Sequence, residues 1–74
     1  MEREEIEQIQ ALSASHDELR HLWHRHQRFE ESLGRLSGLR YPSEAERREM
    51  GKIKRLKLRG KERISQILAA QKSS

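Results

Sequence analysis

Cysteine is absent from this sequence, and so are valine and threonine. Without thiols the chain can form neither disulfide bonds nor thiolate metal sites. The absence of two of the three β-branched residues, and of any long alternation of apolar and polar positions, argues against β-structure. No apolar run approaches the ~20 residues of a membrane span, and the acidic start around Glu4 and Glu5 does not resemble a signal peptide. We therefore expect a cytoplasmic protein.

Apolar residues are also scarce. They make up 32% of the 74 residues, against 38% for charged residues. A chain this short supplies roughly 3–5 kcal/mol from its core and has no room for a Rossmann unit, a barrel or a two-carboxylate cleft. The residues that are abundant, namely Glu, Arg, Lys, Leu, Gln and Ala, all favour helices. We expect a single all-α domain over residues 1–74.

The first helix is expected to be short, within residues 1–14. Ile6, Ile9 and Leu12 lie on one side of it, and acidic residues fill its first turn, where they complement the helix dipole. Ser15 followed by Glu18 is a capping-box pattern, in which each side chain accepts a hydrogen bond from a backbone N–H of the other residue. This pattern predicts that a second helix starts at His16.

The second helix, over residues 15–39, has the clearest pattern in the chain. Apolar positions recur at alternating intervals of three and four residues, which is the heptad rhythm of packed helices, with one polar member. Its members are Leu19, Leu22, His26, Phe29, Leu33 and Leu36. Gly38 is a plausible helix end, and Pro42 cannot continue a helix comfortably, so we expect a turn at residues 40–43.

The third helix is expected over residues 44–71, with residues 72–74 as a frayed tail. Ser43 and Glu46 repeat the capping-box pattern at its start. Its apolar positions fall within about 60° on either side of Ile53 on a helical wheel. They are Met50, Ile53, Leu56, Ile64, Ile67 and Leu68. Leu58 points away from this side.

Folding the third helix back on the second gives a long antiparallel α-hairpin that resembles a coiled coil. The expected register places Leu19 opposite Ile64, and Leu33 opposite Met50. It also places His26 opposite Lys57, and Leu22 opposite Gly60, where Trp23 fills the space left by the missing side chain. The first helix would cover the open end near Ile67 and Leu68.

Residues 53–68, Ile-Lys-Arg-Leu-Lys-Leu-Arg-Gly-Lys-Glu-Arg-Ile-Ser-Gln-Ile-Leu, resemble the C-terminal signature of the small bacterial YdcH-like family. Leu22, His26, Phe29 and Leu33 match that family's Leu-x3-His-x2-Leu-x3-Ile rhythm, so the resemblance covers about residues 16–68. The chain departs from the family pattern by having Gly60 for Leu, Glu62 for Asp and Glu18 for His. The resemblance implies a long α-hairpin, often preceded by a short helix, in a family of unknown function with no catalytic chemistry.

Four histidines crowd into one part of the second helix. Glu18 and His21 have the spacing found in di-iron helix bundles, but those bundles need a second such motif, and the third helix has no histidine. We therefore expect His16, His21 and His24 to be surface residues, with no metal and no cofactor. His26 lies among the apolar positions, where it either fixes the register of the hairpin, which we favour, or senses pH.

Charge is divided unevenly: residues 1–40 have a net charge of −2 and residues 41–74 of +6. Five basic residues share one face of the third helix and form what we call the basic stripe: Arg48, Lys52, Arg55, Arg59 and Arg63. The stripe can follow phosphates, but no aromatic residues alternate with it for base stacking.

No catalytic arrangement and no phosphate loop assembles, so we expect neither an enzyme nor a small-molecule substrate. The leading expectation is a non-enzymatic interaction module that self-associates or binds a protein partner through helix–helix contacts, because Trp23, Leu39 and Leu58 would stay near water in a lone hairpin. The alternative is a protein that binds nucleic acid or another polyanion through the basic stripe.

Overall fold

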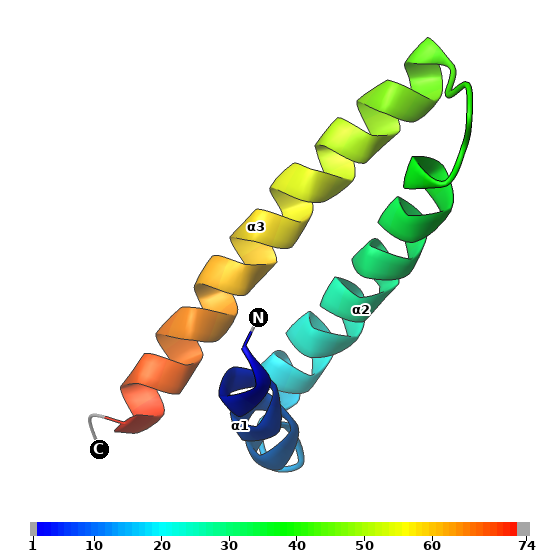
Figure 1. Cartoon of the computed structure of the whole chain (residues 1–74). Helices are drawn as coiled ribbons and strands as arrows, with labels where there is room; N and C mark the ends of the chain where they lie inside the picture. The colour runs from blue at the N-terminus through cyan, green and yellow to red at the C-terminus, as the bar shows by residue number, and fades with distance from the viewer. Residues whose placement is uncertain (1, 73–74) are drawn as a thin grey trace.

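Three α-helices make up the part of the chain that the computed structural model describes, residues 2–72. They are α1 (Arg3–Ser13), α2 (Asp17–Ser37) and α3 (Glu44–Lys72). Helices α2 and α3 run antiparallel side by side, and α1 packs across the end at which α2 begins and α3 ends (Figure 1). This arrangement confirms the predicted all-α hairpin with a short N-terminal helix. Residues 73–74 of the expected frayed tail lie outside the described residues.

The molecule is elongated, with extents of 48 × 20 × 17 Å. Helix α3 alone accounts for most of this length, because its 29 residues rise about 1.5 Å each. No described helix is long and apolar enough to cross a membrane. We call the end where all three helices meet the base, and the two-helix part formed by residues 29–37 and 44–56 the turn half.

Helix α2 begins differently from the prediction, because His16 and not Ser15 is its N-cap. The Nδ1 atom of His16 accepts a hydrogen bond from the backbone N–H of Leu19 at 3.2 Å. Ser15 instead belongs to the end of α1, where its backbone N–H and its hydroxyl both donate to the carbonyl of Leu12. Ser15 thus pairs with a carbonyl that α1 itself leaves without a partner. The next residue, His16, has the extended backbone that an N-cap needs and caps α2 instead.

Helix α3 begins as the capping-box pattern predicts. The backbone N–H of Glu46 donates to Ser43 Oγ at 3.1 Å, and the backbone N–H of Ser43 donates to Glu46 Oε1 at 2.8 Å. Hydrogen bonding of the Glu46 carboxylate by Ser43, chiefly by its backbone N–H, holds the pKa of Glu46 below its usual value. The chain thus turns sharply after Gly38, where α2 ends in an ordinary right-handed conformation, and enters α3 with its first amides satisfied.

The densest packing lies at the base. Ile9 from α1, Leu19 from α2, and Ile64 and Ile67 from α3 form one buried cluster, against which Leu12, Leu22, Trp23 and Leu68 also pack. Fully burying one such side chain stabilises the fold by roughly 1.5–3 kcal/mol. Two sequence expectations are met here, since Leu19 and Ile64 share the cluster and α1 covers the end near Ile67 and Leu68.

The eleven residues proposed for the hairpin core are all withdrawn from solvent, but to different degrees. Those that are buried are Leu19, His26, Ile53, Ile64 and Ile67, and those that are half-buried are Leu22, Phe29, Leu33, Leu36, Met50 and Leu56. Within the turn half only Ile53 is buried, so the apolar side chains there cover one another incompletely. Leu58 is 57% exposed on the far side of α3, where the helical wheel places it.

Candidate interaction surface

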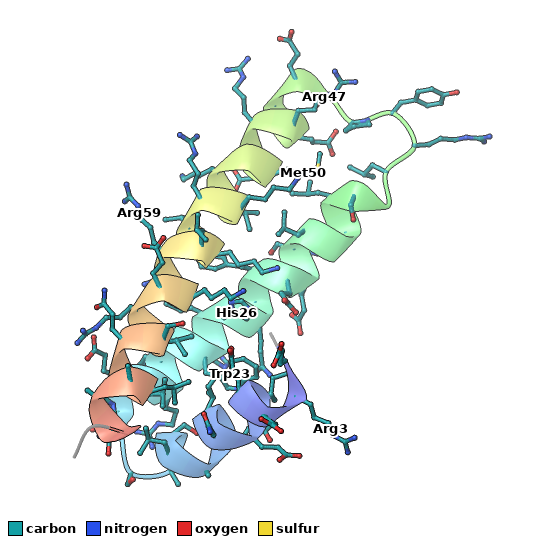
Figure 2. All side chains as sticks on the ribbon, turned by 60° about the vertical axis from the view of Figure 1, so that its left-hand side comes forward. Arg3, Trp23, His26, Arg47, Met50 and Arg59 are labelled. Carbon is teal, nitrogen blue, oxygen red and sulfur yellow. The ribbon has the colours of Figure 1, made fainter. Side chains whose placement is uncertain are left out.

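The interface between α2 and α3 contains one polar layer, centred on His26. This side chain is only 5% exposed, and its ring stacks on that of Trp23 with centroids 5.7 Å apart (Figure 2). Its Nε2 atom lies 3.3 Å from Glu30 Oε1, and Lys57 Nζ from α3 lies 3.2 Å from the same oxygen. Glu30 therefore links the two helices through one carboxylate oxygen.

The charges in this layer shift the pKa values of its members. Burial lowers the pKa of His26, and Lys57 lowers it further, although Glu30 opposes both effects. The hydrogen bond from Lys57 lowers the pKa of Glu30, with a smaller contribution from His26. These shifts favour the neutral form of the His26 imidazole and the ionised form of the Glu30 carboxylate.

The other ring nitrogen of His26 has no partner. Nδ1 is buried and makes no hydrogen bond. A buried polar atom without a partner destabilises a fold by about 1–3 kcal/mol. We therefore expect His26 to lower the stability of a layer that an aliphatic residue would fill, and its role in setting the register stays a prediction.

Trp23 does not fill the space at Gly60, so this prediction is wrong. Trp23 packs against the base cluster and against His26, while a Cβ atom placed on Gly60 would meet no atom within 4 Å. The indole lies about 120° around α2 from Phe29, on the flank where α1 offers an apolar surface. The space at Gly60 therefore remains open.

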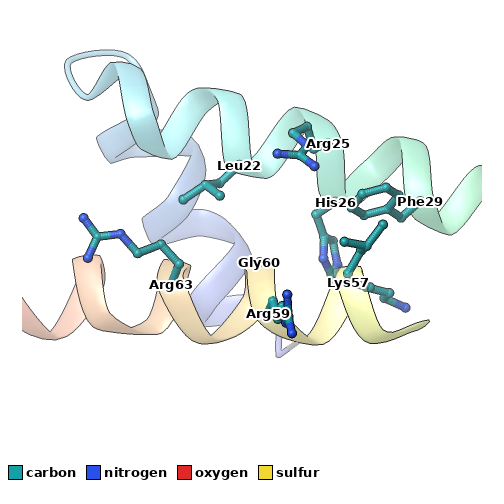
Figure 3. A pocket seen from close by; sticks show the side chains of 9 residues that line it. Leu22, Arg25, His26, Phe29, Lys57, Arg59, Gly60 and Arg63 are labelled. Atoms are coloured by element: carbon teal, nitrogen blue, oxygen red, sulfur yellow. The ribbon is translucent and has the colours of Figure 1, made fainter. Parts of the chain in front are cut away.

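A cavity of about 250 Å³ occupies that space between α2 and α3 (Figure 3). Its apolar lining comes from Leu22, Phe29 and Leu56, and no residue of α1 contributes to it. Its remaining lining residues are Arg25, His26, Lys57, Arg59, Gly60 and Arg63.

The cavity continues as a groove toward the turn. A second hollow shares Arg25 and Phe29 with it, and a third hollow, which shares Ser32 with the second, reaches Leu36 and Leu39. We call this groove the open face and define it by its apolar residues: Leu22, Phe29, Leu36, Leu39 and Leu56. Four of them are half-buried and Leu39 is 42% exposed, so the open face is an apolar strip that the chain itself leaves partly uncovered.

Cationic side chains line the open face at the Gly60 end. Arg63 donates to both carboxylate oxygens of Glu18, at 2.9 and 2.8 Å, which lowers the pKa of Glu18 and raises that of Arg63. The guanidinium of Arg25 lies 5.6 Å from the centroid of the Phe29 ring. Arg59 is exposed and has no ion pair within residues 2–72. Two cations at this end, Arg25 and Arg59, thus have no anionic partner in the described chain.

The predicted basic stripe is exposed along its whole length, but two of its members are engaged within the chain. Arg48 lies 3.6 Å from Glu44, and Arg63 binds Glu18. Lys52, Arg55 and Arg59 have no ion pair in the described part of the chain. The stripe therefore offers three uncommitted cations.

The histidine cluster is not gathered around one point. His16 is engaged as the cap of α2, and His21 and His24 are exposed. Among residues 2–72 no group of three or more His, Cys, Asp or Glu side chains is close enough together to hold a metal ion.

Sequence reasoning missed the role of Glu30. It stands four residues after His26, which places both side chains on one face of α2, and His26 was already expected opposite Lys57. Those two relations together would have predicted the bridge. The sequence also indicated the cavity, because Gly60 lies among the apolar positions of α3 and has no side chain to fill the space between the helices.

No protein-family model, curated protein or solved structure matches the chain. The resemblance to the YdcH-like family therefore stays a prediction.

Proposed function

We propose that the chain is a small, non-enzymatic interaction module of the cytoplasm that binds another protein helix along its open face. The observation that supports this proposal most directly is the continuity of the groove from Leu22 to Leu39. Apolar strips of this kind on a small protein mark binding surfaces more often than isolated exposed residues do. An amphipathic helix lying in such a groove would contact it with residues spaced three and four apart.

Incomplete packing in the turn half also supports the proposal. The base has α1 as a third helix, whereas the turn half has none. A partner helix on the open face would supply the missing third layer and cover Phe29 and Leu36. Phe29 is the aromatic residue of this surface, and aromatic side chains near the centre of an interface contribute most of its binding energy.

Photo-crosslinking tests the proposal. A benzophenone-bearing amino acid replaces Phe29 in one variant and the exposed Leu58, on the far side of α3, in a matched control. We expect protein adducts, identified by mass spectrometry, from position 29 and few from position 58. Equal adduct yields at the two positions, or adducts with nucleic acid alone, would contradict the proposal.

Polyanion binding through the basic stripe is the second candidate, supported by the three uncommitted cations Lys52, Arg55 and Arg59. Fluorescence anisotropy with short DNA and RNA at two salt concentrations tests it. Each neutralised phosphate contributes to a steep loss of affinity as salt rises. Binding that persists at physiological salt, and that the triple replacement of these residues by Gln abolishes, would favour this candidate over the first.

A further inference from the structure

The residues that line the open face have opposite net charge at its two ends. At the Gly60 end Arg25 and Arg59 are unpaired, while Lys57 and Arg63 are neutralised by Glu30 and Glu18. At the turn end the groove is lined by Glu46 and Glu49, with Arg35 as the only cation. Glu49 is exposed and has no ion pair within the described residues.

We propose that the partner of the open face is a second copy of the chain, docked antiparallel, so that the cationic end of each copy faces the acidic end of the other. This inference rests on the proposed function and names its partner. A two-fold contact needs a surface that is complementary to itself. A groove with cations at one end and acids at the other meets this condition when the two copies are antiparallel, whereas a parallel pair would oppose like charges.

The geometry along α3 agrees with a two-fold axis near the middle of the groove. Arg59 and Glu49 are ten residues apart in the sequence, which is about 15 Å along a helix. The midpoint falls at residue 54, and the expected register, with Leu33 opposite Met50, places this residue level with Phe29 along the hairpin. A two-fold rotation about this point places Arg59 of each copy opposite Glu49 of the other copy. It also brings the Phe29 side chains of both copies to the centre of the contact.

The shapes of the two ends also match. The cavity of about 250 Å³ at Gly60 has an apolar lining and room for a large aliphatic side chain. The same two-fold rotation places the turn end of the second copy over this cavity of the first copy. Leu36, which is half-buried, and Leu39, which is 42% exposed, lie at that end. One of these leucines from each copy would fill the cavity of the other.

Charge reversal tests the inference on the full chain. Analytical ultracentrifugation over a range from low to high micromolar is expected to show a reversible dimer. Arg59→Glu alone and Glu49→Arg alone should each weaken dimerisation by at least about tenfold, because each removes two symmetric pairs and opposes like charges. The double variant should regain affinity, since reciprocal pairs re-form. Lys61→Glu is the matched control and should leave the dimer unchanged, because Lys61 is exposed, does not line the cavity and lies about 160° around α3 from Arg59.

Filling the cavity is an independent test. Gly60→Leu places a side chain where no neighbour lies within 4 Å, so the helical signal in circular dichroism should be kept or increased. Dimerisation should nevertheless weaken by at least about tenfold, because the new side chain occupies the cavity that would hold the leucine of the second copy. Gly60→Leu with unchanged dimerisation would overturn the cavity's role.

A chain that stays monomeric at high micromolar concentration would overturn the inference, as would a dimer whose affinity the double charge reversal does not restore. A monomeric chain that crosslinks through position 29 to a different protein would overturn this inference while supporting the proposed function. No adduct at position 29 would contradict both.

Discussion

The base and the turn half of this hairpin use the same kinds of residue but reach different degrees of packing. At the base α1 covers one flank of the α2–α3 pair, and Ile9, Leu19 and Ile64 are almost fully buried. In the turn half the same two helices continue without a third, and Ile53, at 6% exposure, is the only buried side chain there. The comparison shows that these two amphipathic helices leave apolar residues partly exposed where no third helix covers them, and the proposed partner would cover that part.

The largest expected effect tests this difference directly. Ile64→Ala should lower the free energy of unfolding by about 3 kcal/mol, since the base is closely packed and cannot collapse around the missing atoms. Ile53→Ala should lower it by about half as much, because its neighbours already contact water. Urea unfolding followed by circular dichroism, at low protein concentration, measures both. Equal losses would show that the two regions are packed equally well.

The next prediction removes the third helix from the base. Ile9→Glu would place a charge in the buried cluster, so α1 should detach, and the free energy of unfolding should fall by about 2 kcal/mol through lost apolar burial. Trp23, the single tryptophan, then becomes more exposed and its emission shifts to longer wavelength. Gln10→Glu, one residue further along on the exposed side of α1, is the matched control. An unchanged emission spectrum for Ile9→Glu would contradict the docking of α1.

A smaller effect concerns the polar layer between the two regions. Because the pKa of His26 is lowered from 6.5, the unfolded chain binds a proton more readily than the folded chain, so stability should fall as the pH drops below about 6.5. His26→Leu should raise the free energy of unfolding at neutral pH by about 1 kcal/mol and make this fall shallower. Thermal unfolding between pH 7 and pH 5 measures both. A large loss of helical signal for His26→Leu would contradict this account of the layer.

Further acidification should destabilise the wild type and His26→Leu alike. The pKa values of Glu18, Glu30 and Glu46 are all lowered from 4.5, by Arg63, Lys57 and Ser43 respectively. Groups of this kind stabilise the fold above their unfolded pKa and lose that contribution as the pH falls through their folded pKa. The wild type and His26→Leu should therefore differ most in their response near pH 6 and only slightly near pH 4, where the small contribution of His26 to the lowered pKa of Glu30 is lost.

The smallest expected effect concerns the cap of α2 at the base. His16→Asp should raise the free energy of unfolding by about 0.5–1 kcal/mol, because aspartate is a preferred N-cap and its charge complements the helix dipole. His21→Asp, at an exposed position inside the helix, should bring no such gain. Thermal unfolding of the two variants at neutral pH measures the difference. A gain at position 21 equal to that at position 16 would mean that net charge, rather than capping, is responsible.

Much of the fold could be predicted because local and long-range signals agree. The heptad spacing from Leu19 to Leu36, the Pro42 interruption and the cap formed by Ser43 and Glu46 all point to the same hairpin, and the structure contains it. Where two helices meet within a few residues, the signals conflict. Ser15 is suited both to ending α1 and to starting α2, and the sequence pattern does not say which backbone group it will satisfy.

The candidate surface was less predictable, because it depends on which flank of the hairpin α1 covers. Phe29 is one of the apolar positions of α2 and Trp23 lies beside them on the other flank, and a helical wheel does not say which of the two flanks α1 will cover. Once α1 packs beside Trp23, the flank with Phe29 and Gly60 becomes the open one. The choice between flanks is therefore made by tertiary packing, not by local sequence.

The carboxylate of Glu30 makes the sliding of the two long helices along each other stepwise. A displacement of α3 by half a helical turn, about 2.7 Å, would separate Lys57 Nζ from the oxygen that it contacts. A displacement by a whole turn, about 5.4 Å, would bring up Lys54 or Lys61, which stand three and four residues from Lys57 on neighbouring positions of α3. The charge pair therefore opposes partial displacements, and the choice among whole-turn alignments is made at the base, where only one of them keeps Ile64 against Ile9 and Leu19.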